Sequence, residues 1–267
     1  MSENMQTCSS CGELVPIEYV VCVWCGFDLT AEHIRRSGIV VGRNEAFGRM
    51  KRVTLDPFNT FKEISLIPDL KGPRYIFYFI GVAMTLNMLA VFSKLDGLAF
   101  NDENLEIILY ARYNIGIKVT TVIALTFLLI QPIFLFIIFN FVWRTGTRFI
   151  GFLSKTFGGT GDKEKIRSVI GYSMLPVLYG WTLAWILRLL SPSETVSDPD
   201  SYASIEEALI TVSKDGIGAV ANFIIILSWI WAAGLAIIGI SRVTRLSYVE
   251  GVIVAGFPYL LFMTVVT

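Results

Sequence analysis

Charged residues are scarce in this chain. They make up 16% of its 267 residues, whereas roughly 25% is usual for a soluble domain. Hydrophobic residues account for 54%, and the mean hydropathy is +0.63. This balance excludes an ordinary soluble protein and indicates a membrane protein. Because Lys and Arg together equal Asp and Glu in number, the net charge is zero and favours no class of charged partner.

Charge is also missing from the middle of every long apolar run. Proton-coupled pumps and voltage sensors depend on intramembrane charge, so its absence argues against both classes. The single histidine, His33, lies outside the apolar runs, and no nucleophile–base set is recognisable. We therefore expect no enzymatic activity. The first residues contain no apolar segment typical of a signal peptide, so the first span is expected to direct its own insertion.

Cysteine is absent after residue 25, and the four that are present repeat one motif. They form Cys8-x-x-Cys11-Gly and Cys22-x-x-Cys25-Gly. Each pair can place two thiolates on one ion, and the glycine that follows lets the backbone turn with positive φ. The spacing predicts a zinc ribbon over residues 1–34 that binds one structural zinc ion. Two disulfides are the alternative, and they would require an oxidising compartment.

The charge of this ribbon argues against nucleic-acid binding. It contains acidic residues but no Lys or Arg before Arg35, and phosphate contacts need a basic surface. Two interpretations stay open: a protein-docking module, or a folded cap without a partner. Between the motifs, residues 18–21 fit a short strand, and His33 is interpreted as a solvated linker residue.

Residues 35–73 are predicted to form a basic linker followed by an interfacial helix. Asp56-Pro57 is a helix start, with the aspartate as N-cap and the proline in the first turn. Phe58, Phe61 and Ile64 then recur on one side. We expect this side to lie in the lipid headgroup layer. The alternative is an ordinary amphipathic helix packed on the protein itself.

Residues 74–267 contain five apolar stretches that approach or exceed the roughly 20 residues needed to cross a bilayer. The predicted spans are 75–92, 118–143, 166–190, 217–240 and 251–266. The predicted fold is therefore an all-α polytopic membrane protein with five transmembrane helices, interfacial amphipathic helices and a small N-terminal β zinc ribbon.

The loops between the spans alternate in charge. The segments before span one, after span two and after span four are basic, whereas the loops after spans one and three are acidic. The positive-inside rule then places the N-terminus and the zinc ribbon in the cytosol and the C-terminus outside. A capping box at Ser204 and Glu207 predicts a short helix in the outer loop. Residues 148–157 are expected to continue span two and to be bent onto the cytosolic interface.

A few polar residues and prolines remain inside the predicted spans. Their candidate functional members are Gln131, Pro132, Asn140, Tyr172, Ser173 and Pro176. They fit either interhelical hydrogen bonding or a polar pocket between spans two and three. Gly158, Gly159 and Gly161 precede the third span, and we interpret them as a hinge at the membrane surface. A phosphate loop is rejected, because Asp162 separates Gly161 from Lys163 and no strand precedes it.

One part of the chain resembles the central signature of the Yip-domain family of membrane proteins. It consists of Gly158-Gly-x-Gly161, a charged segment and Gly171-Tyr-Ser-x-x-Pro176. The segment 56–61, Asp-Pro-Phe-Asn-Thr-Phe, is similar to another part of that pattern. The resemblance runs from about Arg52 onward. It implies five spans with a cytosolic N-terminus and a role in vesicle trafficking, in which family members engage small GTPases and one another. The ribbon departs from the long polar segment of eukaryotic members and resembles prokaryotic ones.

The sequence thus predicts a non-enzymatic membrane scaffold or adaptor that recruits a cytosolic partner through its ribbon. The alternative is a transporter or channel for a neutral or lipidic solute, lined by Gln131, Asn140, Tyr172 and Ser173. The expected partners are the lipid bilayer and a cytosolic or membrane protein, without nucleic acid. A homo- or hetero-oligomer is left open.

Overall fold

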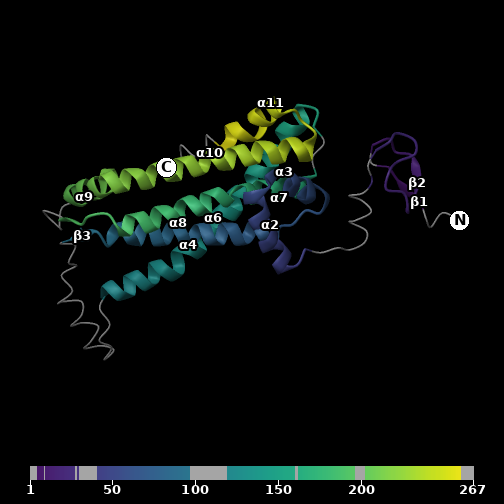
Figure 1. The fold of residues 1–267 in the computed structure, drawn as a ribbon. Coiled ribbons are helices and arrows are strands. Elements are labelled where there is room, and N and C mark those ends of the chain that lie inside the picture. The colour runs from purple at the N-terminus through teal and green to yellow at the C-terminus, as the bar shows by residue number, and fades with distance from the viewer. Residues whose placement is uncertain are drawn as a thin grey trace.

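The computed structural model describes residues 5–8, 10–27, 29, 41–96, 119–159, 162–195 and 202–259. Side chains are described for these residues except at 96, 119–128, 195 and 202–205. Figure 1 shows a small β module at the N-terminus and a bundle of long helices. The helices α2, α3 and α7 lie at one end of this bundle, hereafter the α2 end, and β3 and α9 lie at the other.

The N-terminal module is built on two short antiparallel strands, β1 (Met5–Thr7) and β2 (Leu14–Pro16). The predicted strand at 18–21 is wrong. The backbone N–H of Tyr19 donates to the carbonyl of Pro16, so the chain turns where a strand was expected. The Gln6 side chain fixes this turn by donating to the carbonyls of both Pro16 and Tyr19.

Two short helices precede the first long one: α2 (Arg43–Leu55) and α3 (Pro57–Leu66). Asp56 caps α3 as predicted, since its carboxylate accepts from the N–H of Asn59. The expectation that the apolar side of α3 faces lipid is wrong for Phe61 and Ile64, which are fully buried. Phe61 lies against Gly239 of α10, where a Cβ would come within 3.3 Å of its ring. This helix therefore packs on the protein itself.

Four segments of the described chain are long and apolar enough to cross a membrane: Lys71–Phe92, Leu129–Thr156, Lys163–Leu189 and Gly216–Thr244. They correspond to α4 (Lys71–Phe92), α6 (Val119–Thr156), the pair α7 (Lys163–Ser173) and α8 (Leu175–Leu189), and α10 (Gly216–Thr244). These helices match predicted spans one to four. Residues 148–156 continue span two as a helix, because α6 runs to Thr156. Their bend onto the cytosolic interface stays a prediction.

The chain after α10 continues in a short helix, α11 (Tyr248–Gly251), and a π-helical turn, η1 (Val252–Gly256). The predicted fifth span, 251–266, lies outside the described residues from position 260 onward. At the opposite end, β3 (Leu95–Asp96) pairs in parallel with β4 (Glu194–Thr195). The predicted outer-loop helix is present as α9 (Tyr202–Lys214), although the side chain of Ser204 is outside the described set.

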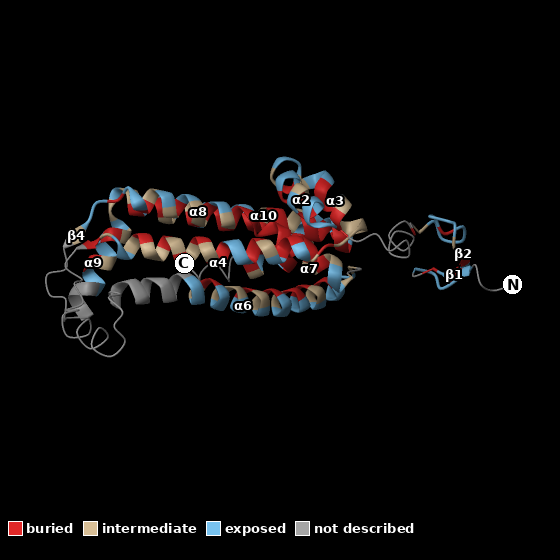
Figure 2. Cartoon of the chain, turned by 90° about the horizontal axis from the view of Figure 1, so that it is seen from below, coloured by how far each residue is buried: buried red, intermediate tan, exposed pale blue. Residues whose placement is uncertain are grey.

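The core of the bundle surrounds α10, which packs against α8, α7 and α3. Gly180 of α8 allows a close approach to α10, because a Cβ there would lie 2.3 Å from the hydroxyl of Ser228. Figure 2 shows α7 largely buried and α6 exposed along much of its length. Half of the apolar stretch of α10 is buried. Exposed Ile133, Ile137 and Phe141 give α6 an apolar outer face suited to lipid.

Candidate functional site

The two cysteine motifs fold into matching turns. Gly12 donates to the carbonyl of Cys8 and Gly26 to that of Cys22, both at 2.9 Å. These glycines have φ of 79° and 67°, as the motif predicts. Cys8 and Cys22 also donate their N–H groups to carbonyls five residues ahead, both at 2.8 Å. The repeated turns bring all four thiols to one point.

The four sulfur atoms have the spacing of a tetrahedral metal centre. All lie within 4.8 Å of one another, and both Cys8–Cys25 and Cys11–Cys22 are separated by 3.7 Å. Thiolates held about 2.3 Å from a central zinc ion would be about 3.8 Å apart. The cysteines are free, so the donor set fits one ion. Cys8, Cys11, Cys22 and Cys25 thus form the metal-compatible cluster that the spacing predicts.

The ribbon presents apolar side chains to solvent around this cluster. Within the second motif, Trp24 is 68% exposed and Val23 is 60% exposed. Further exposed apolar residues of the same module are Leu14, Tyr19, Val20 and Val21. The indole N–H of Trp24 donates to the carbonyl of Leu14, which holds the ring against the β2 strand. We call Val23, Trp24 and these four residues the ribbon face.

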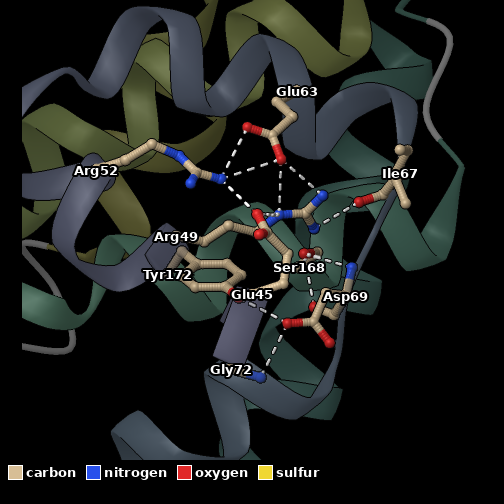
Figure 3. A network of polar contacts seen from close by, with 9 residues as sticks. All are labelled: Glu45, Arg49, Arg52, Glu63, Ile67, Asp69, Gly72, Ser168 and Tyr172. Carbon is tan, nitrogen blue, oxygen red and sulfur yellow. Dashed lines mark hydrogen bonds and ion pairs between the residues drawn. The ribbon is translucent and has the colours of Figure 1, made fainter. Parts of the chain in front are cut away.

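The signature tyrosine is anchored to the start of the first long helix. The Tyr172 hydroxyl, fully buried, donates to the carboxylate of Asp69 at 2.6 Å (Figure 3). Ser168 donates to the Asp69 carbonyl and accepts from its N–H. The Asp69 carboxylate also accepts from the N–H groups of Lys71 and Gly72, and so caps α4. We call Asp69, Ser168 and Tyr172 the Asp69 cluster.

The glycines beside this cluster are required by close packing. A Cβ at Gly72 would lie 2.1 Å from the Tyr172 hydroxyl, and one at Gly171 would lie 2.3 Å from Pro73. Both distances are shorter than two such atoms allow, so a side chain at either position would force Tyr172 or Pro73 to move. The Gly171-Tyr172 part of the signature therefore fastens α7 to the first turn of α4, a role that the sequence did not reveal.

A second polar network ties α2 to α3. Arg49, whose side chain is 1% exposed, donates to Glu63 at 3.0 Å and to the carbonyl of Ile67 at 2.8 Å. Arg52 binds Glu63 and Glu45 at the surface (Figure 3). Its hydrogen bond to Glu45 raises the pKa of Arg52 above the usual value, so it stays charged. Arg49, Glu63 and Asp69 were missed because each bonds to a residue on another element.

Ser173 forms a buried pair with a residue that sequence reasoning missed. Its hydroxyl lies 2.6 Å from that of Tyr259, which also donates to the carbonyl of Ile170. The π-helical turn η1 ends three residues before Tyr259 and shifts the register of the helix that follows. The pair joins α7 to the last described helical segment.

The remaining candidates are held separately from one another. Gln131 donates to the sulfur of Met88 at 3.2 Å, and Asn140 donates to the Phe136 carbonyl of its own helix. Pro132 lies within α6. Pro176 lies in the first turn of α8, after a break at Met174, so its missing N–H costs no hydrogen bond there. Gln131, Asn140, Tyr172 and Ser173 thus bond to four different groups rather than to one another.

The glycine run ends α6. Gly158 has φ of 79°, and Gly159 donates to the carbonyl of Ser154, which closes the last turn. Gly161 lies outside the described residues. The turn lies where the hinge was predicted, at the end of α6. That the chain moves about this turn stays a prediction.

A family model described as "Yip1 domain" matches residues 51–267. No curated protein and no solved structure matches the chain. The matched range begins within α2 and includes α3, α4 and the Asp69 cluster, whereas the four-cysteine cluster precedes it.

Proposed function

The chain belongs to the Yip1 domain family, and on that premise we propose that it is a non-enzymatic membrane scaffold. In this proposal the membrane domain is an anchor, and the ribbon, folded around one zinc ion, recruits a cytosolic protein. The recruited partner would serve membrane organisation or trafficking. Zinc would be bound by the four thiolates and would supply folding energy rather than chemistry.

The observation that carries this proposal is the ribbon face. A small module whose core is limited to a few side chains leaves Trp24 and Val23 mostly exposed. Exposed apolar clusters on soluble modules mark protein–protein contacts, and tryptophan is enriched among the residues that dominate such contacts. A cap without a partner gains nothing from this exposure. The docking interpretation is therefore favoured over the passive cap.

The membrane domain supports the role of an anchor. Tyr172 and Ser173 use their hydroxyls within the protein, and Gln131 and Asn140 bond to separate groups. A transport pocket needs convergent polar groups left available for a solute. These four side chains have instead the character of contacts between and within helices.

We propose that the α2 end of the bundle is cytosolic. Basic residues gather there from several elements: Lys71 and Arg74 at the start of α4, Lys155 at the end of α6, and Arg242 at the end of α10. By the positive-inside rule this places the ribbon, which precedes α2, in the cytosol as well. The guanidinium of Arg245, the C-cap residue of α10, lies 4.8 Å from the ring of Phe27, two residues after the ribbon's last cysteine.

The test is affinity capture of the tagged full-length chain from its native membrane, compared with the double variant Val23→Ser, Trp24→Ser. We expect the variant to keep its metal, since no metal ligand is altered. The amount of one captured cytosolic protein should fall by about tenfold or more, which is the effect expected when a tryptophan is removed from the centre of an interface. The matched control is Leu55→Ser, which removes an equally exposed apolar side chain from α2. Equal capture by all three forms would contradict recruitment by the ribbon face.

A further inference from the structure

A hollow lined by three cations lies where α2 meets the start of α4. Its lining comes from both helices and from α6, with Arg43, Lys71 and Arg74 as its charged members. Its volume is about 640 Å³. The aromatic part of the lining is Phe47, Tyr75, Tyr78, Phe79 and Phe136. Phe47 and Tyr75 stack with their ring centroids 5.4 Å apart, which fixes one wall.

Among the residues that the structure describes, no carboxylate lines this hollow. Two acidic residues that are close in sequence to the lining cations are bound elsewhere. Asp69 caps α4 and accepts from Tyr172, and Glu45 pairs with Arg52. Within the described part of the chain, Arg43 and Arg74 form no ion pair, and the Lys71 ammonium reaches only the carbonyl of Val41, at 3.4 Å. Three cations thus face one space without a protein counter-ion, which makes the space complementary to an anion.

An apolar groove continues from the hollow into the membrane region. It lies between α4 and α6 and is lined by Tyr78, Val82, Thr85, Leu86, Leu129, Pro132 and Ile133. Tyr78 lines both spaces. The hydroxyl of Thr85 donates to the Gly81 carbonyl of its own helix, so the groove offers little that is polar. Its volume is about 420 Å³.

The depth of the two spaces fits one leaflet of a bilayer. From Arg74 to Leu86, α4 rises about 18 Å at 1.5 Å per residue. One leaflet of a bilayer with a hydrocarbon core of about 30 Å is about 15 Å deep. The cations then lie at headgroup level, and the groove follows the acyl region. Tyr75 and Tyr78, between them, lie at the level that interfacial tyrosines prefer.

We propose that this surface binds an anionic glycerophospholipid from the leaflet at the α2 end. Its phosphate would lie among Arg43, Lys71 and Arg74, and one acyl chain would lie in the groove between α4 and α6. Arginine suits this role because its planar guanidinium can bind two phosphate oxygens. The site is independent of the ribbon and of the partner that the ribbon would recruit.

The test measures lipid bound to the full-length chain in detergent by native mass spectrometry. The probes are dioleoyl-phosphatidylglycerol and dioleoyl-phosphatidylcholine at equal concentration. We expect the anionic lipid to bind at least about tenfold more tightly, since each cation near an anionic headgroup strengthens binding several-fold. The triple variant Arg43→Gln, Lys71→Gln, Arg74→Gln should reduce this preference to near unity.

The matched control is Arg144→Gln, Arg148→Gln, Lys155→Gln. It removes the same charge from exposed positions on α6 and should keep the preference. Val82→Trp, which fills the groove, should weaken the binding of both lipids. Its elution volume in size-exclusion chromatography should equal that of the parent, which shows that the variant is folded. If the control triple variant lost the preference for the anionic lipid equally, the preference would arise from the overall positive charge and the proposal would be overturned. Displacement of the lipid by inorganic phosphate at the same concentration would also overturn it, as would unchanged binding to Val82→Trp.

Discussion

Replacing Cys22 with alanine is expected to abolish metal binding and unfold the ribbon while the helices remain folded. Among the described residues, the ribbon's apolar core consists of Cys8, Val15, Cys22 and Leu29, with Phe27 beside it. So small a core cannot offset the loss of chain entropy. Structural zinc supplies roughly 10–16 kcal/mol of apparent binding free energy in comparable peptides. Elemental analysis should find one zinc per chain in the parent and none in the variant.

Hydrogen exchange should separate the two parts of the molecule. In Cys22→Ala, amides of residues 5–27 should lose protection, whereas those of α4 and α10 should keep theirs. Ser10→Ala is the control, because Ser10 contacts the Cys8 sulfur through its backbone N–H, which alanine retains. In the parent chain, alkylation of the thiols should require a chelator. Thiols that react only after treatment with a reductant would identify disulfides and contradict the metal centre.

Gly72→Ala is expected to destabilise the membrane domain by about 2–4 kcal/mol. The added Cβ would lie 2.1 Å from the Tyr172 hydroxyl, so the tyrosine must move away. Its movement would break the 2.6 Å hydrogen bond to Asp69 and loosen α7 from α4. Thermal or denaturant unfolding in detergent measures the change. Gly234→Ala, in α10, is the control, because nothing lies within 4 Å of its added Cβ, and it should stay within about 1 kcal/mol of the parent.

A double-mutant cycle attributes this effect to the Asp69 cluster. If Gly72→Ala acts by displacing Tyr172, the same change made in a Tyr172→Ala background should cost much less than in the parent. The coupling free energy is expected to be about 1–3 kcal/mol. Additive effects of the two substitutions would show that the tyrosine does not mediate the loss.

The features that the sequence predicted correctly depend on residues close together in the chain. The cysteine motifs need only two local turns, so their spacing was sufficient to predict the cluster. Four of the five predicted spans correspond to segments long and apolar enough to cross a membrane, because length and composition are read directly from the sequence. Asp56 was identified as an N-cap because the residues it caps follow at once.

Contacts between distant residues could not be predicted in the same way. Tyr172 and Asp69 are far apart in sequence, and no periodicity links a carboxylate before one span to a hydroxyl in another. Phe61 and Ile64 have the spacing of a lipid-facing helix, which is also that of a helix packed on protein. At residues 18–21, β-branched composition favoured a strand, but the tertiary hydrogen bonds of Gln6 stabilise a turn.

Site-specific photo-cross-linking from position 24 in the native membrane tests the adaptor role most directly. A photoreactive residue there replaces Trp24, which is 68% exposed, and a second one at the equally exposed Leu55 serves as reference. We predict a discrete adduct between the chain and one cytosolic protein from position 24, absent from position 55 and lost when Cys22 is also replaced. Adducts only with lipid, or the same adducts from both positions, would contradict recruitment by the ribbon.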